Sequence, residues 1–254
     1  MSADTLLSIE NLTVKFGGLT AIKDLSFQVE KGRIHALIGP NGAGKSTTFN
    51  CVSRYYNPTS GRVSFNGNDI THRPAHDIAG LGIARTFQNL ELFNELTVMD
   101  NVLLGTYTHG ARSVLKRLQR PDGETRDFAE SLLERVGLLE YRHYRANGLD
   151  FGRQKMLELA RALAIKPTLL LLDEPAAGLR NREIDSLDRI LTELVARDGV
   201  TVLLVEHVMQ LVMAISQRIT VMSFGEKIAE GTPAEIRCNE RVIEAYLGKG
   251  EGND

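Results

Sequence analysis

The chain has 254 residues, a formal net charge of −2 and a hydrophobic fraction of 43%. This length favours one large domain or two small ones, and the apolar fraction is enough for a substantial core. The near-neutral charge argues against a broad basic surface for nucleic acid. Every apolar run is far shorter than the roughly 18 residues of a membrane-spanning helix. Two widely separated cysteines, Cys51 and Cys238, predict reduced structural thiols.

The first ninety or so residues predict mostly strands, with one glycine-rich turn. Residues 6–16 and 25–32 alternate apolar and polar side chains, as half-buried strands do. Residues 33–39 are more uniformly apolar and predict a buried strand that leads into the turn. The other elements expected here are one helix and two short strands, at 45–56, 61–67 and 83–88.

The pattern becomes helical between Leu92 and Gly148. Thr97 stands three residues before Asp100, which resembles a capping box at a helix start, and residues 124–138 have apolar positions at helical spacing. Beyond this region helices and strands alternate, as is typical of a parallel α/β sheet whose sites lie at the carboxyl ends of its strands. The expected order is helix 152–165, strand 168–172, helix 182–197, strand 200–205, helix 208–216, strand 218–223, and short helices at 233–238 and 240–248.

The segment GPNGAGKST at 39–47 fits the pattern G-x-x-x-x-G-K-[ST] between a predicted buried strand and a predicted helix. Its glycines let the backbone curl so that successive N–H groups face one cluster of phosphate oxygens. Lys45 supplies a mobile cation for the β- and γ-phosphates, and the Ser46 hydroxyl is placed for Mg²⁺. A plain glycine turn is the alternative, and the flanking strand and helix argue against it. The predicted nucleotide-binding residues are Gly39, Pro40, Asn41, Gly42, Ala43, Gly44, Lys45, Ser46 and Thr47.

A second motif, TLLLLDEP at 168–175, is an apolar strand that ends in two carboxylates. Asp173 is suited to hold Mg²⁺ through water, because hard cations prefer oxygen ligands. Glu174 follows at once, where a general base could polarise an attacking water. An acidic pair at a strand end is weak evidence alone. On the same sheet as a phosphate loop, it is strong evidence for phosphoryl chemistry.

Together these motifs resemble the nucleotide-binding subunit of ATP-binding-cassette (ABC) transporters over nearly the whole chain. The family's landmarks occur in its order: the phosphate loop, TFQN with Gln88, LDFGRQKMLELARAL at 149–163, LLLLDEP at 169–175 and VEH with His207. The resemblance implies an α/β fold, the P-loop NTPase ABC cassette, as a single domain over residues 1–254. A RecA-like parallel-sheet core with an antiparallel β subdomain would cover 1–91 and 165–254, and a helical subdomain would cover 92–164.

The same resemblance implies roles for residues whose types alone are ambiguous. ATP and Mg²⁺ would be the ligands, with Ser46, Gln88 and Asp173 around the metal. Glu174 and His207 would be catalytic, His207 by contacting the γ-phosphate, and Phe16 would stack on adenine. Taken singly, Gln88 could be a polar strand end, His207 a capped loop histidine and Phe16 a core residue; their joint placement favours the functional interpretation.

In this family an LSGGQ-like signature at a helix start binds the ATP held by a second subunit, so that two cassettes sandwich two nucleotides. Here that segment is Asp150, Phe151, Gly152 and Arg153, with aspartate where serine is usual. A second negative charge about 4 Å from the phosphate would cost roughly 4 kcal/mol at an effective dielectric near 20. Arg153 could pair with Asp150 and offset this cost. Alternatively, Asp150 turns inward and only caps its own helix.

A further departure is Arg180, which stands where an aspartate is common in the loop that contacts the dimer partner. Val208 likewise replaces an aspartate that often follows the histidine. The residues that act on the chain's own phosphate loop are complete, and those that act on a partner's nucleotide are altered. We therefore expect normal ATP hydrolysis at the chain's own loop and a weaker or differently tuned composite site for the partner, as would suit an unequal pair of subunits.

Within the ABC family, the finer resemblance is to the ATPase subunit of branched-chain (hydrophobic) amino-acid uptake systems. It rests on FGGLTAIKDLSF at 16–27, GIARTFQNLELFNELTVMDNVLLG at 82–105, LDEPAAGL at 172–179, EGTPAEI at 230–236 and AYLG at 245–248. The cargo would be such amino acids or related small carboxylates and amides. The protein would be peripheral, on the cytoplasmic face of the inner (plasma) membrane.

The implied partners are a second ABC ATPase subunit, in a homo- or heterodimer, and two transmembrane permease subunits. A periplasmic or extracellular substrate-binding protein would act indirectly, and no nucleic acid is implied. Leu92, Phe93 and Leu96 are candidates for the permease socket, unless they are core residues. The alternatives are a lipopolysaccharide-type exporter subunit and a soluble ABC ATPase, which would need a coiled-coil insertion or tandem cassettes. A single-chain phosphate-loop kinase or GTPase would not need the signature helix.

Overall fold

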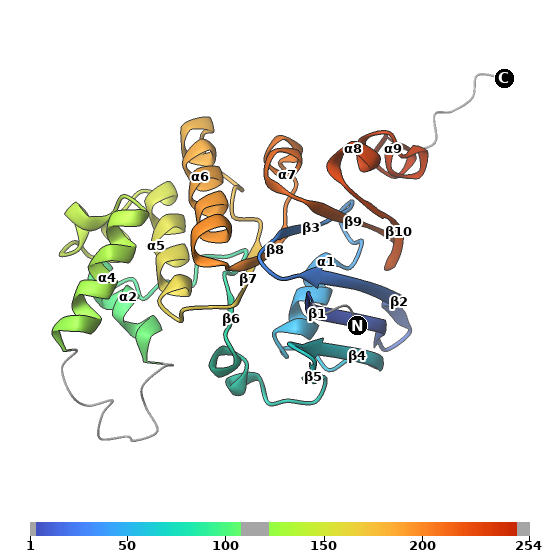
Figure 1. Cartoon of the computed structure of the whole chain (residues 1–254), viewed down its shortest axis with the longest axis horizontal. Helices are drawn as coiled ribbons and strands as arrows, with labels where there is room; N and C mark the ends of the chain where they lie inside the picture. The colour runs from blue at the N-terminus through green and yellow to red at the C-terminus, as the bar shows by residue number, and fades with distance from the viewer. Residues whose placement is uncertain (1–3, 108–121, 248–254) are drawn as a thin grey trace.

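Two β-sheets meet around one helix in the computed structural model, which describes residues 4–107 and 122–247 (Figure 1). The larger sheet has the strand order β10-β9-β3-β8-β7-β6, and within it only the β9–β10 pair is antiparallel. Its strands are β3 (Ile34–Ile38), β6 (Ile83–Arg85), β7 (Leu169–Asp173), β8 (Thr201–Val205), β9 (Arg218–Ser223) and β10 (Glu226–Gly231). The smaller sheet is antiparallel, in the order β2-β1-β4-β5, from β1 (Thr5–Phe16), β2 (Leu19–Glu30), β4 (Ser60–Phe65) and β5 (Asn68–Asp69).

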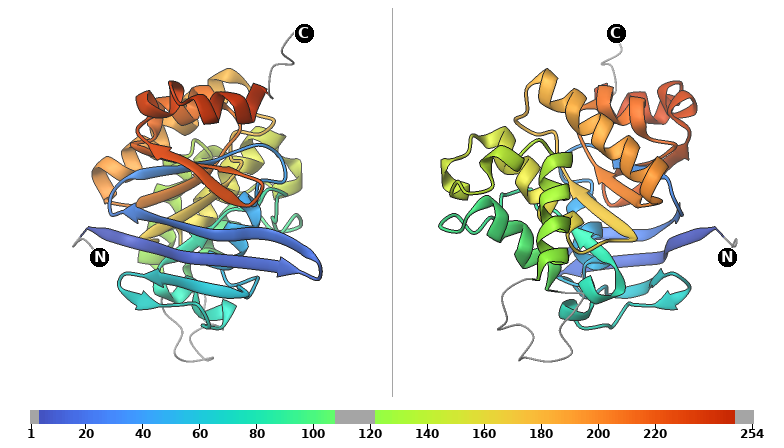
Figure 2. Two further views of the ribbon diagram at one scale, coloured as in Figure 1. Left: turned by 90° about the vertical axis from the view of Figure 1, so that its right-hand side faces the viewer. Right: turned by 60° about the vertical axis from the view of Figure 1, so that its left-hand side comes forward.

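Three helices lie together at one end of the molecule: α2 (Val98–Thr106), α4 (Gly123–Arg135) and α5 (Phe151–Leu163). Thr97 caps α2 as its sequence predicts, because its Oγ1 accepts from the backbone N–H of Asp100 at 3.0 Å. Figure 2 shows the C-terminal helices on the opposite side of the larger sheet from the antiparallel sheet. The other α-helices of the described residues are α1 (Lys45–Val52), α6 (Asn181–Asp198), α7 (Met209–Ile215), α8 (Pro233–Arg237) and α9 (Glu240–Leu247).

The leucine run of β7 explains how one strand joins two cores. Successive side chains of a strand point to opposite faces of the sheet. Leu169 and Leu171 therefore pack with α1 and the antiparallel sheet, whereas Leu170 and Leu172 pack with the helices on the other face. A strand buried on both faces is uniformly apolar, so the run of leucines is what the centre of a parallel sheet requires.

The structure confirms the predicted parallel α/β sheet and differs from the sequence expectations in details. The helix after the glycine turn ends at Val52 rather than at residue 56, because Arg54 adopts a left-handed backbone with φ 64°. The strand expected at 83–88 stops at Arg85. Strand β10 was not predicted, since its sequence, EKIAEG, has few apolar residues, as suits the edge of a sheet. Within the described residues, no helix is both long and apolar enough to span a bilayer.

Two buried side chains in the core have displaced pKa values. His35 of β3 lies with its Nε2 atom 2.8 Å from Oγ1 of Thr220 on β9, and burial lowers the pKa of the imidazole to about 4. Cys51 of α1 is fully buried, and burial raises the pKa of its thiol to about 11. Cys238, beyond α8, is exposed.

The depressed pKa of His35 predicts that the protein loses stability in mild acid. The unfolded chain protonates His35 below about pH 6.5, while the folded chain keeps it neutral until about pH 4. The unfolded state thus binds more protons in this window, so stability is complete above about pH 6.5 and falls toward pH 4, by about 3 kcal/mol from this residue. Urea unfolding across this range should show that the free energy of unfolding falls less steeply with pH in His35→Gln than in the parent protein. The variant His76→Gln, at an exposed site, should have the same pH dependence as the parent. The same pH dependence in His35→Gln would contradict the prediction.

Candidate functional site

The two sequence motifs meet because three parallel strands are adjacent. Strand β8 pairs in parallel with β3 on one side and with β7 on the other. The turn after β3, at 39–44, and the acidic pair that ends β7 therefore emerge at the same edge of the sheet. This edge is where α/β proteins hold their ligands.

The phosphate loop depends on glycines at two places where a side chain would collide with backbone. Gly44 is the N-cap of α1 and has a left-handed conformation with φ 101°, and a Cβ there would lie 2.7 Å from the Ala21 carbonyl oxygen. A Cβ on Gly39 would lie 2.1 Å from the Met222 carbonyl oxygen. The loop therefore packs too closely against its neighbours for other residues.

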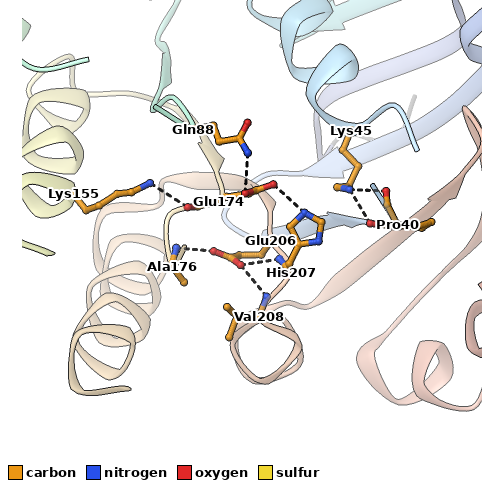
Figure 3. A network of polar contacts seen from close by, with 10 residues as sticks. Pro40, Lys45, Gln88, Lys155, Glu174, Ala176, Glu206, His207 and Val208 are labelled. Atoms are coloured by element: carbon orange, nitrogen blue, oxygen red, sulfur yellow. Dashed lines mark hydrogen bonds and ion pairs between the residues drawn. The ribbon is translucent and has the colours of Figure 1, made fainter. Parts of the chain in front are cut away.

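Lys45 reaches back over this loop, as Figure 3 shows. Its Nζ atom donates to the carbonyls of Gly39 and Pro40 at 2.7 and 3.0 Å. Burial lowers the pKa of Lys45, and the charges of Glu174 and Asp173 oppose that shift. The cation is thus held at the mouth of the glycine loop with two carboxylates nearby.

Glu174 brings together three of the predicted site residues. Its Oε1 atom lies 2.9 Å from Nε2 of His207, and its Oε2 atom accepts from Nε2 of Gln88 at 3.1 Å (Figure 3). The backbone of Glu174 is left-handed, with φ 51°, a conformation that costs a non-glycine residue about 1–2 kcal/mol. It is held there by its N–H, which donates to the Val205 carbonyl at 2.9 Å, and by Lys155, whose Nζ donates to its carbonyl at 3.3 Å.

Glu206 is a structural anchor that the sequence reasoning missed. Its buried carboxylate accepts from the backbone N–H of Ala176 at 2.6 Å through Oε1, and from those of His207 and Val208 at 2.8 and 2.9 Å through Oε2. These bonds tie the turn after β7 to the turn after β8, and so they aim His207 at Glu174 (Figure 3). The available signal was the carboxylate of VEH, which directly follows an apolar strand.

Asp173 is buried beneath this network and paired with a cation. Its Oδ2 atom lies 2.9 Å from Nη2 of Arg85, while Oδ1 is buried without a hydrogen-bond partner among the described residues. Burial raises the pKa of Asp173, and Arg85 opposes the rise. One orphaned carboxylate oxygen beside a phosphate loop fits a Mg²⁺ site, since this ion takes oxygen ligands directly or through water. Arg85 was also missed by sequence reasoning, although a lone charge at the end of a buried strand was the signal.

A cavity of about 570 Å³ joins the glycine loop to the catalytic candidates. Phe16 lines it with 45% of its surface exposed and makes an edge-to-face contact with Tyr56 at 5.2 Å, so the alternative of a core residue is wrong. Leu19 and Phe224 add apolar surface that sequence reasoning did not assign. The predicted residues that line this cavity are Phe16, Asn41, Gly42, Ala43, Gly44, Lys45, Ser46, Thr47, Gln88, Glu174 and His207.

The signature segment lies in a different place and begins α5. Asp150 caps this helix: its Oδ1 accepts from the backbone N–H of Arg153 at 2.9 Å, and its other oxygen pairs with the Arg153 guanidinium. The guanidinium also lies over the Tyr141 ring, 4.6 Å from its centroid. Both expectations for Asp150, the inward cap and the ion pair, are therefore confirmed. Phe151 is half exposed beside it.

Asp150, Gly152 and Arg153 line a second cavity that also contains Arg180 and lacks the phosphate loop. Gly152 lies against α6, because a Cβ there would be 2.4 Å from Oε1 of Glu183. Glu183 in turn accepts from the backbone N–H of Arg180 at 2.7 Å. One chain thus holds the two halves of the expected nucleotide site in separate cavities.

Comparison with known proteins decides the family. Residues 22–177 match the family model for ABC transporters, and residues 226–252 match that for branched-chain amino acid ATP-binding cassette transporters. The chain belongs to the ABC transporter family. It is an ATP-binding cassette of this family, and it therefore binds nucleotide and hydrolyses ATP.

The similarity of this ABC cassette to individual proteins extends over nearly its full length. It is 42% identical over 250 residues to the high-affinity branched-chain amino acid transport ATP-binding protein BraF of Pseudomonas aeruginosa, covering 96% of this chain and 98% of that protein. A solved ABC transporter cassette in its ADP conformation superposes with a TM-score of 0.85 at 32% identity, over 96% of this chain and 99% of that one. A dimeric bacterial ABC transporter cassette gives 0.78 at 26% identity, over 90% and 99%.

Proposed function

We propose that this ABC cassette is the ATP-hydrolysing motor subunit of an importer for branched-chain or other hydrophobic amino acids, or for related small carboxylates and amides. The observation that carries the motor role is Glu174, held between Gln88 and His207 at the edge of the phosphate-loop cavity. The cargo class is supported by the C-terminal family match at 226–252 and by the similarity to BraF. No residue of this chain is assigned to the cargo, which other subunits would carry.

Several residues in and around the cavity are suited to bind nucleotide or to act on it. The N–H groups of the glycine loop and the Lys45 ammonium bind the phosphates, and Phe16 offers an exposed ring to adenine. Glu174 accepts the proton of the attacking water, and Gln88 and His207, which contact its two oxygens, orient it. Mg²⁺ when bound would neutralise charge on the phosphates, and Ser46, Gln88 and Asp173 are the residues that would hold it.

A second cassette would complete the site. The signature residues Asp150 to Arg153 lie in a cavity apart from the chain's own phosphate loop, and a similar cassette forms a dimer. In such a head-to-tail pair, the start of α5 would face the partner's ATP, where helix N–H groups favour an anion. Asp150 is neutralised by its own helix and by Arg153. Asp150 would therefore repel the partner's ATP less than an unpaired carboxylate would, and the composite site would be weakened less.

The transport role requires membrane partners. Phe93 and Leu96 are 54% and 37% exposed, whereas Leu92 packs against the helical core. The first two therefore offer an apolar surface to one of two permease subunits on the cytoplasmic face of the inner membrane, beside the Gln88 segment. A substrate-binding protein would act from the far side of the membrane. The helical subdomain over 92–164 would move with this contact, relative to a core over 1–91 and 165–254.

The import assignment predicts that cargo controls the motor. With its permease subunits and binding protein in proteoliposomes, the cassette should hydrolyse ATP faster when the binding protein carries leucine than when it is empty, by several-fold. An importer should accumulate radiolabelled leucine on the side of the membrane where the cassette and its ATP lie, and an exporter should accumulate it on the opposite side. Transport and ATP hydrolysis are therefore measured together. An ATPase rate that does not respond to the binding protein would contradict the import assignment.

Glu174→Gln tests the general base. The amide keeps the side-chain length and cannot accept the proton, so turnover should fall at least about 100-fold while ATP remains bound. Size-exclusion chromatography in ATP should show a trapped dimer. The matched variant Glu226→Gln, which removes an exposed partner of Lys23, should hydrolyse ATP at the parental rate. Persistent turnover in Glu174→Gln would remove this residue from the role.

The variant Asp150→Ser tests separately the two roles of Asp150, as the cap of α5 and as a negative charge at the composite site. Serine also caps helices, so the free energy of unfolding should stay within about 0.5 kcal/mol, whereas Asp150→Ala should lose about 1 kcal/mol. Loss of the carboxylate should strengthen ATP-induced pairing, read as the dimer fraction over a dilution series. If Asp150→Ser leaves both the dimer fraction and the ATPase rate of the assembled complex unchanged, the proposed tuning of the composite site is wrong.

A further inference from the structure

Arg85 lies at the junction of three elements that converge on the nucleotide site. It ends β6, pairs in register with Leu171 of β7, and its side chain is only 9% exposed. The chain runs from it through Thr86 and Phe87 to Gln88. A buried arginine is costly unless its donors are satisfied and its charge is paired, so its contacts reveal what it serves.

The guanidinium divides its donors between the helix of the phosphate loop and the acidic pair. Nη1 donates to Oδ1 of Asn50 and to Oγ of Ser53, both at 2.7 Å, in α1 and just beyond it. Nη2 donates to Oδ2 of Asp173 at 2.9 Å. The planar fork of arginine can span both sides at once, which the single ammonium of a lysine cannot do.

Aromatic rings hold this fork in position. The guanidinium carbon lies 5.7 Å from the centroid of the Phe49 ring, 5.8 Å from that of Tyr55 and 5.0 Å from that of Phe87. Cation–π attraction of this kind partly offsets the desolvation of the charge. Nε of Arg85 is buried without a hydrogen-bond partner among the described residues. The position of the guanidinium is therefore set by the rings and by the bonds of the two Nη atoms.

The consequence for Asp173 is that its two oxygens are no longer equivalent. Oδ2 is occupied by Arg85, and Oδ1 is buried with no partner in the part of the chain that the structure describes. Rotation of the carboxylate would break the 2.9 Å bond to Nη2. Arg85 therefore fixes which oxygen is left without a partner and ties the position of Asp173 to α1, the helix that begins with Lys45.

We propose that Arg85 is a positioning residue that presents Oδ1 of Asp173 to the Mg²⁺ of bound nucleotide. The inference deepens the proposed function, because it rests on the metal role of Asp173. Arg85 does not touch the nucleotide in this arrangement. Arg85 would instead affect how much Mg²⁺ raises the affinity for ATP. This gain in affinity is seen only when nucleotide binding is compared with and without the metal.

The test compares nucleotide affinity with and without the metal. In a Glu174→Gln background, which blocks turnover, the dissociation constant of a fluorescent ATP analogue is measured in EDTA and in excess Mg²⁺. Arg85→Gln should leave the value in EDTA within about twofold and reduce the gain on adding Mg²⁺ about tenfold, or about 1.4 kcal/mol of coupling. Arg85→Lys should restore part of that gain, since it keeps the charge without the fork.

Two further variants decide between positioning and general stability. Arg62→Gln removes an exposed pair with Asp69 and should leave the gain unchanged. Asn50→Ala frees one side of the fork and should reduce the gain about threefold, which keeps the inference testable if Arg85→Gln does not fold.

A gain in Arg85→Gln equal to that of the background protein would overturn the inference. If Arg85→Gln does not fold, the same result in Asn50→Ala would do so. A purely structural role would weaken binding equally in EDTA and in Mg²⁺, and this outcome also overturns it. A background protein that shows no gain from Mg²⁺ would instead refute the metal role of Asp173, on which the inference rests.

Discussion

The parallel pairing of β8 with β3 and β7 is the constraint on which the site depends. A slip of one residue between β7 and β8 would turn the leucines of β7 to the wrong faces and carry Asp173 and Glu174 away from the glycine loop. Two of the hydrophobic cores resist such a slip, because β7 contributes alternate side chains to each of them. The stability of the fold and the geometry of the catalytic edge thus rest on the same register.

Buried charged groups fix the positions of the loops that the strand register brings to this edge of the sheet. The Glu206 carboxylate is satisfied by three backbone N–H groups from two turns, and the Arg85 fork joins α1 to Asp173. Isolated charges at these depths would be strongly destabilising, and pairing with an opposite charge or with N–H donors offsets that cost. Such groups add little net stability compared with apolar packing, but they select one arrangement of the loops over others.

The sequence predicted the features that are encoded locally. The phosphate loop, the acidic strand end and the alternation of helices and strands each lie within one short segment, and the structure contains them. Arg85 was missed because it pairs with Asp173, 88 positions away, and Glu206 because its bond to Ala176 spans 30 positions. Asp150 shows the intermediate case: sequence left two expectations for it, and only the folded turn shows that cap and ion pair coexist.

The unequal burial of the two cysteines has a practical consequence. Thiol reagents react with the thiolate, and Cys51 is enclosed within α1, the helix that follows the phosphate loop, with its pKa raised to about 11. Cys238 is open to solvent at the end of α8. A maleimide fluorophore would therefore attach to the unmodified chain at one position, Cys238. That label would give a spectroscopic reporter on the C-terminal helices without any cysteine-removing mutation.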